Sequence, residues 1–304
     1  MSKAITPSEI TLPATDQGWG TVLAFLCAHF HRIAAEVWQQ RMLDGKVYWF
    51  DSAEAIRPDT PFRPSRRVCY FREVAAEPVI PFAHQLLYRD EHILLACKPH
   101  FLPVIPGGDF VNECLLERLK RDTGLTDLVP VHRLDNETAG LVLFSCQPQS
   151  RAAYYQLFAE GKVQKQYQAV AELPAQLQQT QLPQHWRIQN RIEKSEPRFL
   201  MRQFDGEVNA DSSLQLVDRR NSVGLFELCP HTGKTHQLRL HMQQIGCPIL
   251  WDKYYPELQP KQRGNFSQPL QLLAKSLSFV DPISGAKHHF QSERQLQSWA
   301  SGTT

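Results

Sequence analysis

The stretch HRLDNETAGLVLFS, residues 132–145, constrains the fold and the chemistry of this chain more than any other segment. Its second half, AGLVLFS (139–145), is apolar and predicts a buried strand. The run LVPVHRLD (128–135) predicts another strand, and the polar residues DNET (135–138) lie between the two. We therefore expect the charged end of HRLD to lie in a connection between two strands.

This connection carries His132, Arg133 and Asp135. Loops held between rigid strands are a common place for catalytic side chains. Asp135 also has a simpler explanation, because an aspartate readily caps its own backbone in a turn. On the local pattern alone, we favour the turn role over catalysis.

Around this stretch, helical and strand patterns are mixed without a regular strand–helix–strand repeat. Gly124, Gly161 and Gly246 are expected to end helices, because glycine tolerates a left-handed backbone conformation. Residues 175–222 are rich in Gln, Pro and charge, and only short strands are expected there. The predicted elements are a hairpin at 84–99, helices at 111–124, 149–161 and 234–246, and strands at 165–173 and 224–230. This mixture predicts an α+β fold rather than a doubly wound sheet.

Residues 1–80 predict a small α/β domain ahead of a larger one at 81–304. Residues 1–20 are polar and are expected to be loosely ordered. The rest of the small domain predicts two helices between Gly20 and Met42, a stop at Gly45, strands at 46–50 and 68–74, and a proline-containing linker at 73–84.

Composition narrows the class of protein. Of the 304 residues, 42% are hydrophobic and 21% charged, as in an ordinary globular protein. No run approaches the roughly 20 apolar residues that span a bilayer, and the first residues do not resemble a secretory signal. The seven cysteines are scattered without a CxxC pair, which predicts reduced thiols in a cytoplasmic protein. The net charge is only +2, so any binding of nucleic acid must rest on local basic clusters.

Two further segments carry polar residues whose local pattern favours ordinary structural roles. In KQYQAV (165–170), strand alternation puts Tyr167 on the face of Ala169, where a tyrosine usually packs in a core. In HTGKTHQLRLHMQQIGCPI (231–249), Arg239 lies on the polar side of a predicted helix, where an arginine is usually solvated. The histidines there recur every five residues, unlike the i, i+4 pair of a metal-binding helix, so we expect no metal.

Taken together and in order, four segments resemble the motifs of the RluA-type family of RNA pseudouridine synthases. LLYRDEHILLACKP resembles the family's opening hairpin and KP turn, and KQYQAV resembles its KxYxA strand. HRLDNETAGLVLFS resembles its catalytic motif, and HTGKTHQLRLHMQQIGCPILWDKYY resembles its closing motif, GRTHQIRxHxxxxGxPIxGDxxY. The match covers most of residues 85–280, and its length and order outweigh the local interpretations given above.

The resemblance implies a mixed, largely antiparallel sheet with a central cleft, and isomerisation of uridine to pseudouridine in structured RNA. Asp135 is then the catalytic carboxylate, Tyr167 lies beside the base, and Arg239 pairs with the carboxylate. The implied substrate-binding residues are His132, Arg133, Lys165, Thr235, His236 and Gln237. The reaction involves no redox or group transfer, so no cofactor is expected. The expected partner is ribosomal or transfer RNA, with no membrane, and the protein is expected to be a monomer.

The small N-terminal domain is similar to an RNA-binding domain first seen in a ribosomal small-subunit protein. The similarity rests on few positions, which are Trp38, Arg41, Gly45 and Val47. Basic residues that could follow an RNA backbone are Arg63, Arg66, Arg67 and Arg72 in this domain, and Arg187, Arg191, Lys194, Arg198 and Arg202 in the larger one.

The sequence departs from the family pattern at four positions. Ala139 replaces the usual serine, His100 and Phe101 stand where a small residue and a glycine are common, and Trp251 replaces a glycine. His100, Phe101 and Trp251 concern the rim of the expected cleft, so the RNA and the uridine that are modified stay open.

Two other functions are compatible with parts of the sequence. The first is a non-catalytic RNA-binding or ribosome-assembly protein on the same fold, which the presence of Asp135, Tyr167 and Arg239 disfavours. The second is a hydrolase that uses Asp135 with His132. It lacks a GxSxG nucleophile motif and does not explain the other three segments.

Overall fold

Two units make up the part of the chain that the computed structural model describes, residues 2–260 and 264–300. The first unit consists of Met1–Pro78 with Gly107–Asn112, and the second of Val79–Pro106 with Glu113–Thr304. Each unit has its own sheet and its own core. Because Gly107–Asn112 lies within the sequence of the second unit, no single cut in the chain separates them.

In the first unit, two short helices pack on a three-stranded sheet. The helices are α1 (Val22–His29) and α2 (Ala35–Leu43), and the sheet has the order β2 (Ser8–Thr11), β4 (Arg67–Tyr70), β3 (Val47–Trp49). Trp38 and Trp49 are buried in this core. Gly45 has a φ of +68°, as expected of the residue that ends the second helix.

Two expectations for this unit were wrong. Residues 1–20 are not loose throughout, because β2 pairs with β4, and β1 (Ser2–Lys3) pairs with β5 (Glu73–Val74). Neighbouring strands thus satisfy backbone groups of this polar segment. The segment 68–74 is also not one strand, since β4 and β5 pair with different partners.

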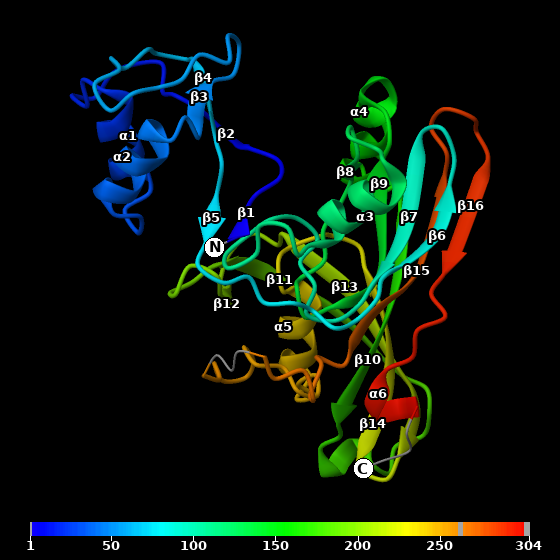
Figure 1. Cartoon of the computed structure of the whole chain (residues 1–304). Coiled ribbons are helices and arrows are strands. Elements are labelled where there is room, and N and C mark those ends of the chain that lie inside the picture. The colour runs from blue at the N-terminus through cyan, green and yellow to red at the C-terminus, as the bar shows by residue number, and fades with distance from the viewer. Residues whose placement is uncertain (1, 261–263, 301–304) are drawn as a thin grey trace. The chain divides into compact units, whose positions relative to one another are not determined.

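The second unit is built on a large mixed sheet, as the sequence predicts. Its path runs β12-β11-β13-β14-β10-β15-β9-β7-β6, with β16 beside β15 and β8 beside β9. Every pairing is antiparallel except that of β15 with β9. The strands are β6 (Gln85–Arg89), β7 (Ile93–Lys98), β8 (Val129–Pro130), β9 (Ala139–Ser145), β10 (Gln164–Glu172), β11 (Gln184–Lys194), β12 (Met201–Phe204), β13 (Ala210–Arg220), β14 (Val223–Pro230), β15 (Leu272–Val280) and β16 (Lys287–Gln291). The sheet twists strongly, so that β7 and β11 run in clearly different directions (Figure 1).

The parallel pairing of β9 and β15 requires a glycine at position 140. Gly140 has a φ of +116°, and a Cβ there would lie 2.2 Å from the carbonyl oxygen of Ala274. Only glycine allows this approach without moving a backbone. The start of β9, and therefore the polar loop that precedes it, is fixed against the middle of the sheet.

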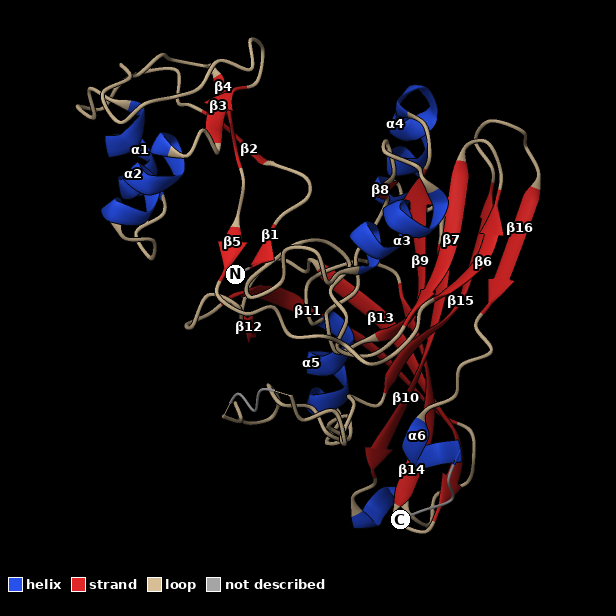
Figure 2. Cartoon of the chain, viewed as in Figure 1, coloured by secondary structure: helices blue, strands red, loops and turns tan. Residues whose placement is uncertain are grey.

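Helices cover parts of this sheet (Figure 2). Helix α5 (Gln237–Gln244) contributes Leu238 and Met242 to a core with β10, β13 and β14, and Ile245 packs against it, as the helical spacing predicts. The remaining helices are α3 (Leu115–Thr123), α4 (Pro148–Ala159), the 3₁₀ turn η1 (Ala175–Leu177) and α6 (Gln297–Ala300). Gly124 and Gly161 follow α3 and α4 with left-handed φ values of +71° and +67°, as expected.

The strand predictions failed in two places. Between 175 and 222 the chain forms two strands of 11 residues each, β11 and β13, rather than short ones. The inward positions of β13 include the small polar Ser212, so the alternation of apolar and polar residues that indicates a strand is interrupted in the sequence. The predicted strand 128–135 is reduced to Val129–Pro130, so Asp135 lies in an irregular loop.

Candidate active site

The β8–β9 loop presents Asp135 at the centre of a cluster of charged residues. The backbone oxygen of Asp135 accepts a hydrogen bond from the amide of Thr138, at 3.1 Å, which closes a turn. The Asp135 side chain is 30% exposed, whereas those of Glu137 and Asp252 nearby are 17% and 1% exposed. Asp135 is therefore the carboxylate of this cluster that is most open to a ligand.

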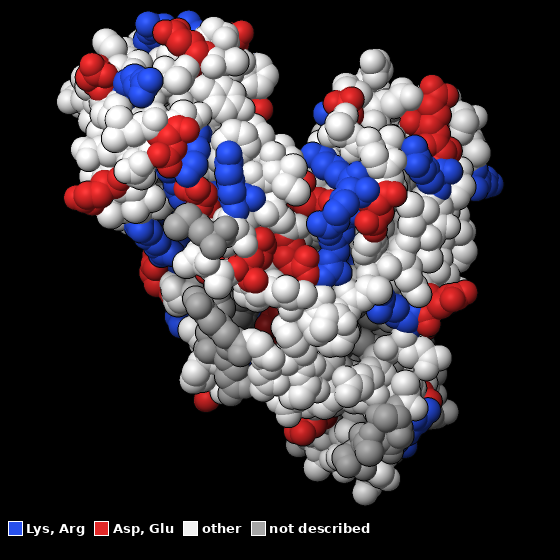
Figure 3. Space-filling model, in the orientation of Figure 1, with Lys and Arg blue, Asp and Glu red and all other residues white. Residues whose placement is uncertain are grey.

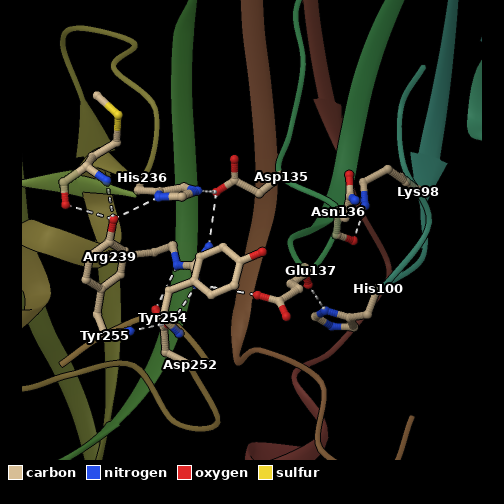
Figure 4. Close-up of polar contacts among 11 residues, drawn as sticks. Lys98, His100, Asp135, Asn136, Glu137, His236, Arg239, Asp252, Tyr254 and Tyr255 are labelled. Carbon is tan, nitrogen blue, oxygen red and sulfur yellow. Dashed lines mark hydrogen bonds and ion pairs between the residues drawn. The ribbon is translucent and has the colours of Figure 1, made fainter. Parts of the chain in front are cut away.

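Arg239, in the first turn of α5, joins these carboxylates (Figure 4). Its Nη1 lies 3.6 Å from Oδ2 of Asp135, and its Nη2 lies 3.4 Å from Oε2 of Glu137. The expected proximity of Asp135 and Arg239 is confirmed. The guanidinium fork, however, binds Asp252 in bidentate fashion and not Asp135, through Nε at 2.7 Å and Nη2 at 2.5 Å. The local expectation of a solvated Arg239 was also wrong, since its side chain is 1% exposed.

Asp252 holds the loop after α5 as well as the arginine. Its Oδ1 accepts hydrogen bonds from the amides of Tyr254 and Tyr255, at 2.8 and 3.1 Å. Burial lowers the pKa of Arg239, but the hydrogen bonds and charge of Asp252 outweigh it and raise the pKa overall. Arg239 therefore stays charged, and its buried Nη1 has no hydrogen-bond partner among the described residues.

His236 approaches Asp135 from the residue before α5. Its Nδ1 lies 2.8 Å from the Tyr255 hydroxyl, and its Nε2 lies 3.9 Å from Oδ2 of Asp135. Burial lowers the pKa of His236, although the charge of Asp135 opposes this. The Tyr255 hydroxyl donates to the backbone oxygen of Met201, at 3.1 Å, so the neutral His236 ring carries its proton on Nδ1 and donates it to that hydroxyl. The left-handed φ of His236, +56°, is costly for a residue with a side chain, and it places the imidazole here.

Aromatic rings flank the charged cluster. Tyr167, on β10, packs with Ala169 and Ala171 against the core under α5, as strand alternation predicts. Burial, and then the charge of Asp135, raise the pKa of Tyr167, so its hydroxyl keeps its proton at neutral pH. The Tyr254 ring lies over the Arg239 guanidinium, with 4.5 Å between its centroid and Cζ. The site thus combines a partly open carboxylate with flat apolar faces.

Lys98 and His100 support the β8–β9 loop from the side away from the charged cluster, a role that was not predicted for them from the sequence. The buried Lys98 Nζ donates to the backbone oxygens of Pro99, Leu102 and Asn136, at 3.0, 2.7 and 3.0 Å. His100 Nδ1 lies 2.6 Å from the backbone oxygen of Glu137. Burial lowers the pKa of Lys98 to about 7, while three carbonyl acceptors match the three N–H donors of its charged form.

We expect Lys98→Met to loosen this loop specifically. The change keeps the apolar stem but leaves buried carbonyl oxygens without donors, which should lower the free energy of unfolding by on the order of 2–4 kcal/mol. Urea denaturation measures that loss. Hydrogen exchange should then show faster exchange at the Thr138 amide, which depends on the turn at Asp135.

The control for this prediction is Lys275→Met. Lys275 Nζ also donates to two carbonyl oxygens, those of Ser292 and Arg294, at 2.6 and 3.2 Å. The Lys275→Met variant should lose stability, but hydrogen exchange at its Thr138 amide should not be selectively faster. Unchanged exchange at Thr138 in Lys98→Met would contradict the bracing role.

The residues expected to bind substrate have different surroundings. His236 lies beside Asp135, and Arg133 and Thr235 are exposed. His132 accepts a hydrogen bond from the Leu143 amide at Nε2, at 3.1 Å, and burial lowers its pKa to about 3. It therefore ties the loop to β9 as a neutral residue.

The other two predicted contacts, Lys165 and Gln237, are partly or fully buried. The Gln237 amide donates to Asp211 and Ser212 and accepts from Thr232 and Lys234, so all its donors and acceptors bind protein groups. Lys165 lies on β10, where burial lowers the pKa of its ammonium.

Residues 2–260 and 264–300 contain no candidate metal site and no candidate membrane span. No group of three or more His, Cys, Asp or Glu residues there could hold a metal ion. Likewise, none of the helices described has the length and apolar character needed to cross a bilayer.

Comparison with known proteins identifies relatives of this chain. The family model described as RNA pseudouridylate synthase matches residues 92–244. The dual-specificity RNA pseudouridine synthase RluA of Haemophilus influenzae is 30% identical over 219 residues, which cover 71% of this chain and 95% of that protein. An uncharacterised RNA pseudouridine synthase of Synechocystis is 28% identical over 237 residues, or 77% of this chain and 79% of that protein.

Solved structures share the fold. Human RNA pseudouridylate synthase domain containing 1 aligns with a TM-score of 0.55 and 18% identity, over 75% of this chain and 97% of that chain. Human RNA pseudouridylate synthase domain containing 4 aligns with a TM-score of 0.52 and 23% identity, over 69% of this chain and 88% of that chain. At these identities, the likeness supports the architecture of the sheet and no more.

Proposed function

Since this chain belongs to the RluA family of RNA pseudouridine synthases, we propose that Asp135 is the carboxylate with which it converts specific uridines of structured RNA to pseudouridine. The observation that carries the proposal is the position of Asp135. It is the most exposed carboxylate of the cluster and lies 3.6 Å from the buried, charged Arg239. This arrangement supplies a negative charge that a ligand can reach and a positive charge that holds it in place.

The conversion of uridine to pseudouridine requires one bond to the ribose to break and another to form. The bond between the ribose C1′ and N1 of uracil breaks, the base turns, and C5 bonds to C1′. C5 then loses its proton and N1 gains one, so that the product is an isomer of the substrate. Positive charge develops at the sugar as the first bond breaks. A carboxylate can stabilise that charge, attack C1′, or remove a sugar proton. Asp135 is suited to each of these three routes.

The target base must first leave its stack, at a cost of about a few kcal/mol. Tyr167 and Tyr254 offer aromatic faces for a displaced uracil, and base–aromatic stacking contributes about 1–3 kcal/mol per base. Because the Tyr167 hydroxyl keeps its proton, we assign it a hydrogen-bond donor role rather than that of a base for the C5 proton. The exposed Arg133 and Thr235 are suited to phosphate or ribose contacts.

The substrate class proposed is ribosomal or transfer RNA. It is supported by the names of relatives, which include the dual-specificity RluA proteins and, at 33% identity, the ribosomal large subunit pseudouridine synthase C of Rickettsia prowazekii. Mapping pseudouridine across total RNA from cells with and without this protein tests the proposal. At least one uridine should lose its modification when the protein is absent. An unchanged map, with purified protein inactive on unmodified total RNA, would contradict the function.

We further propose that the small N-terminal domain, residues 1–80, binds RNA. The Arg63 guanidinium lies over the Trp49 ring and that of Arg67 over the Phe50 ring, with Cζ to centroid distances of 5.4 and 3.3 Å. On the face drawn in Figure 3, basic and acidic side chains are interspersed rather than gathered in one patch. Phosphate binding is therefore expected from a few arginines and not from the net charge.

Replacing Arg63 and Arg67 together by glutamine should weaken RNA binding without slowing the reaction on saturating RNA. Each lost phosphate contact should reduce the slope of log K against log salt by about 0.7–0.9. Filter binding over a salt series measures both quantities. Arg89→Gln, on the edge strand β6 of the second unit, is the control. If the slope and affinity of the double variant equal those of the unmodified protein, the first unit does not bind RNA through these residues.

A further inference from the structure

Three phenylalanines of the second unit form an aromatic cluster that the reaction does not explain. The Phe101 ring stacks on Phe82, with centroids 6.2 Å apart and planes at 25°, and meets Phe266 edge-on at 5.2 Å. Phe82 and Phe266 are also in contact, at 5.8 Å. Phe82 is 37% exposed, and the other two rings are half-buried. The cluster is thus partly open to solvent.

Phe101 occupies a backbone conformation that disfavours it. Its φ is +68°, in the left-handed region where residues other than glycine are uncommon and bulky ones are strained. A glycine would meet the needs of the backbone at this turn without strain. The fold therefore does not require the phenylalanine, which suggests that its ring has a use.

The cluster adjoins the catalytic loop through two connections. His100, next to Phe101, lies 2.6 Å from the backbone oxygen of Glu137, two residues after Asp135. On the other side, Lys253 follows Asp252, the bidentate partner of Arg239. Its Nζ lies 5.6 Å from the Phe101 centroid, which places a cation on the cluster. Aromatic faces with one positive charge therefore border the site where a uridine would react.

We propose that Phe82, Phe101 and Phe266 bind an unpaired nucleotide next to the target uridine, with its base stacked on the cluster and its phosphate near Lys253. This inference rests on the function proposed above. Extrusion of one base removes a stacking partner from its neighbours. An aromatic platform beside a cation replaces that partner, whatever the base, because every base has a flat face. The cluster then selects RNA in which such a neighbour is free to unstack.

A series of substitutions at Phe101 tests for stacking. Phe101→Gly removes the ring and relieves the backbone, so folding is not at risk. Phe101→Leu keeps apolar bulk without a flat face, and Phe101→Tyr restores the face. The probe is unmodified total RNA labelled with tritium at C5 of uridine, from which the reaction releases tritium. At limiting RNA, the Phe101→Gly and Phe101→Leu variants should release tritium roughly 5- to 100-fold more slowly than the unmodified protein. The rate of the Phe101→Tyr variant should stay within about 2-fold of it, and the rates of all variants should converge at saturating RNA.

Two controls accompany the series. Phe290→Leu removes a ring from a different aromatic group, on β16, where it contacts Tyr88 at 5.2 Å, and it should not change the rate. Lys253→Gln should reduce the salt dependence of RNA binding, and Lys253→Arg should preserve it. If the Phe101→Leu variant keeps full activity, or if the Phe101→Gly variant is as active as the unmodified protein, the cluster packs against protein or does not touch RNA. The proposal then fails.

A cross-linking experiment separates this proposal from the proposed function. Irradiation of the protein with RNA that contains 4-thiouridine should join a nucleotide to the peptide that carries Phe101, and Phe101→Gly should abolish that cross-link. If no tritium is released but the cross-link forms, the isomerase proposal fails and the nucleotide site stands. If tritium is released and no cross-link forms at the cluster, the nucleotide site fails alone.

Discussion

Replacing Asp135 by asparagine should abolish pseudouridine formation and leave a folded protein that still binds RNA. Asparagine has nearly the same shape but no negative charge, so it can neither stabilise a developing cation at C1′ nor attack it. Removing an essential nucleophile or base typically reduces the rate by about 10⁴-fold or more. Because the Asp135 side chain is 30% exposed, the loss of its charge should cost little stability.

Tritium release measures the activity of this variant, filter binding its affinity for RNA, and thermal unfolding its stability. Asp127→Asn, an exposed residue before β8, is the matched control and should behave like the unmodified protein. Glu137→Gln is the informative comparison, since Glu137 is the other partly exposed carboxylate on Arg239. Activity that survives in Asp135→Asn and disappears in Glu137→Gln would move the catalytic role to Glu137.

Much of this fold could be predicted from hydrophobic periodicity. The run 139–145 is buried at every position, and Leu238 and Met242 of α5 pack where their spacing places them. The long strands β11 and β13 were not predicted because polar residues stand among their inward-facing apolar ones, such as Trp186, Ile188 and Leu214. A polar residue such as Ser212 is tolerated inside when its hydroxyl accepts a hydrogen bond, here from Gln237 at 2.8 Å.

The site was predictable only in part. Asp135 and Arg239 were located by their motifs, and their proximity is confirmed. The closing motif contains Asp252 as well as Arg239, but it does not show that the turn at 252–255 folds back onto α5 and makes Asp252 the bidentate partner. Lys98 was missed for a related reason. A lysine that ends an apolar strand usually reaches solvent, and only the carbonyls that converge on it show that this one is buried.

Substitutions of Arg239 should cause large losses of both stability and activity, because its buried charge links the catalytic loop to Asp252. We expect Arg239→Met to destabilise the protein by about 3–5 kcal/mol, because Asp252 is left as an uncompensated buried carboxylate. Activity should also be lost, since nothing then holds Asp135 or balances its charge. Arg239→Lys keeps a positive charge but not the planar fork, so it should retain more stability than Arg239→Met and still lose most activity.

The effect of Arg239 on stability can be separated from its effect on catalysis by changing Arg239 and Asp252 together. In the double variant Arg239→Met with Asp252→Asn, the fully buried charge of Asp252 is removed together with its partner. The asparagine oxygen can still accept hydrogen bonds from the amides of Tyr254 and Tyr255. Chemical denaturation should show that most of the stability returns, whereas tritium release should stay absent because Asp135 lacks its partner. Arg41→Met, which breaks the 3.5 Å ion pair with Glu73 in the first unit, is the control and should cost stability without slowing the reaction on saturating RNA. If the double variant regains activity together with stability, Arg239 acts only by supporting the fold, and its 3.6 Å approach to Asp135 has no catalytic consequence.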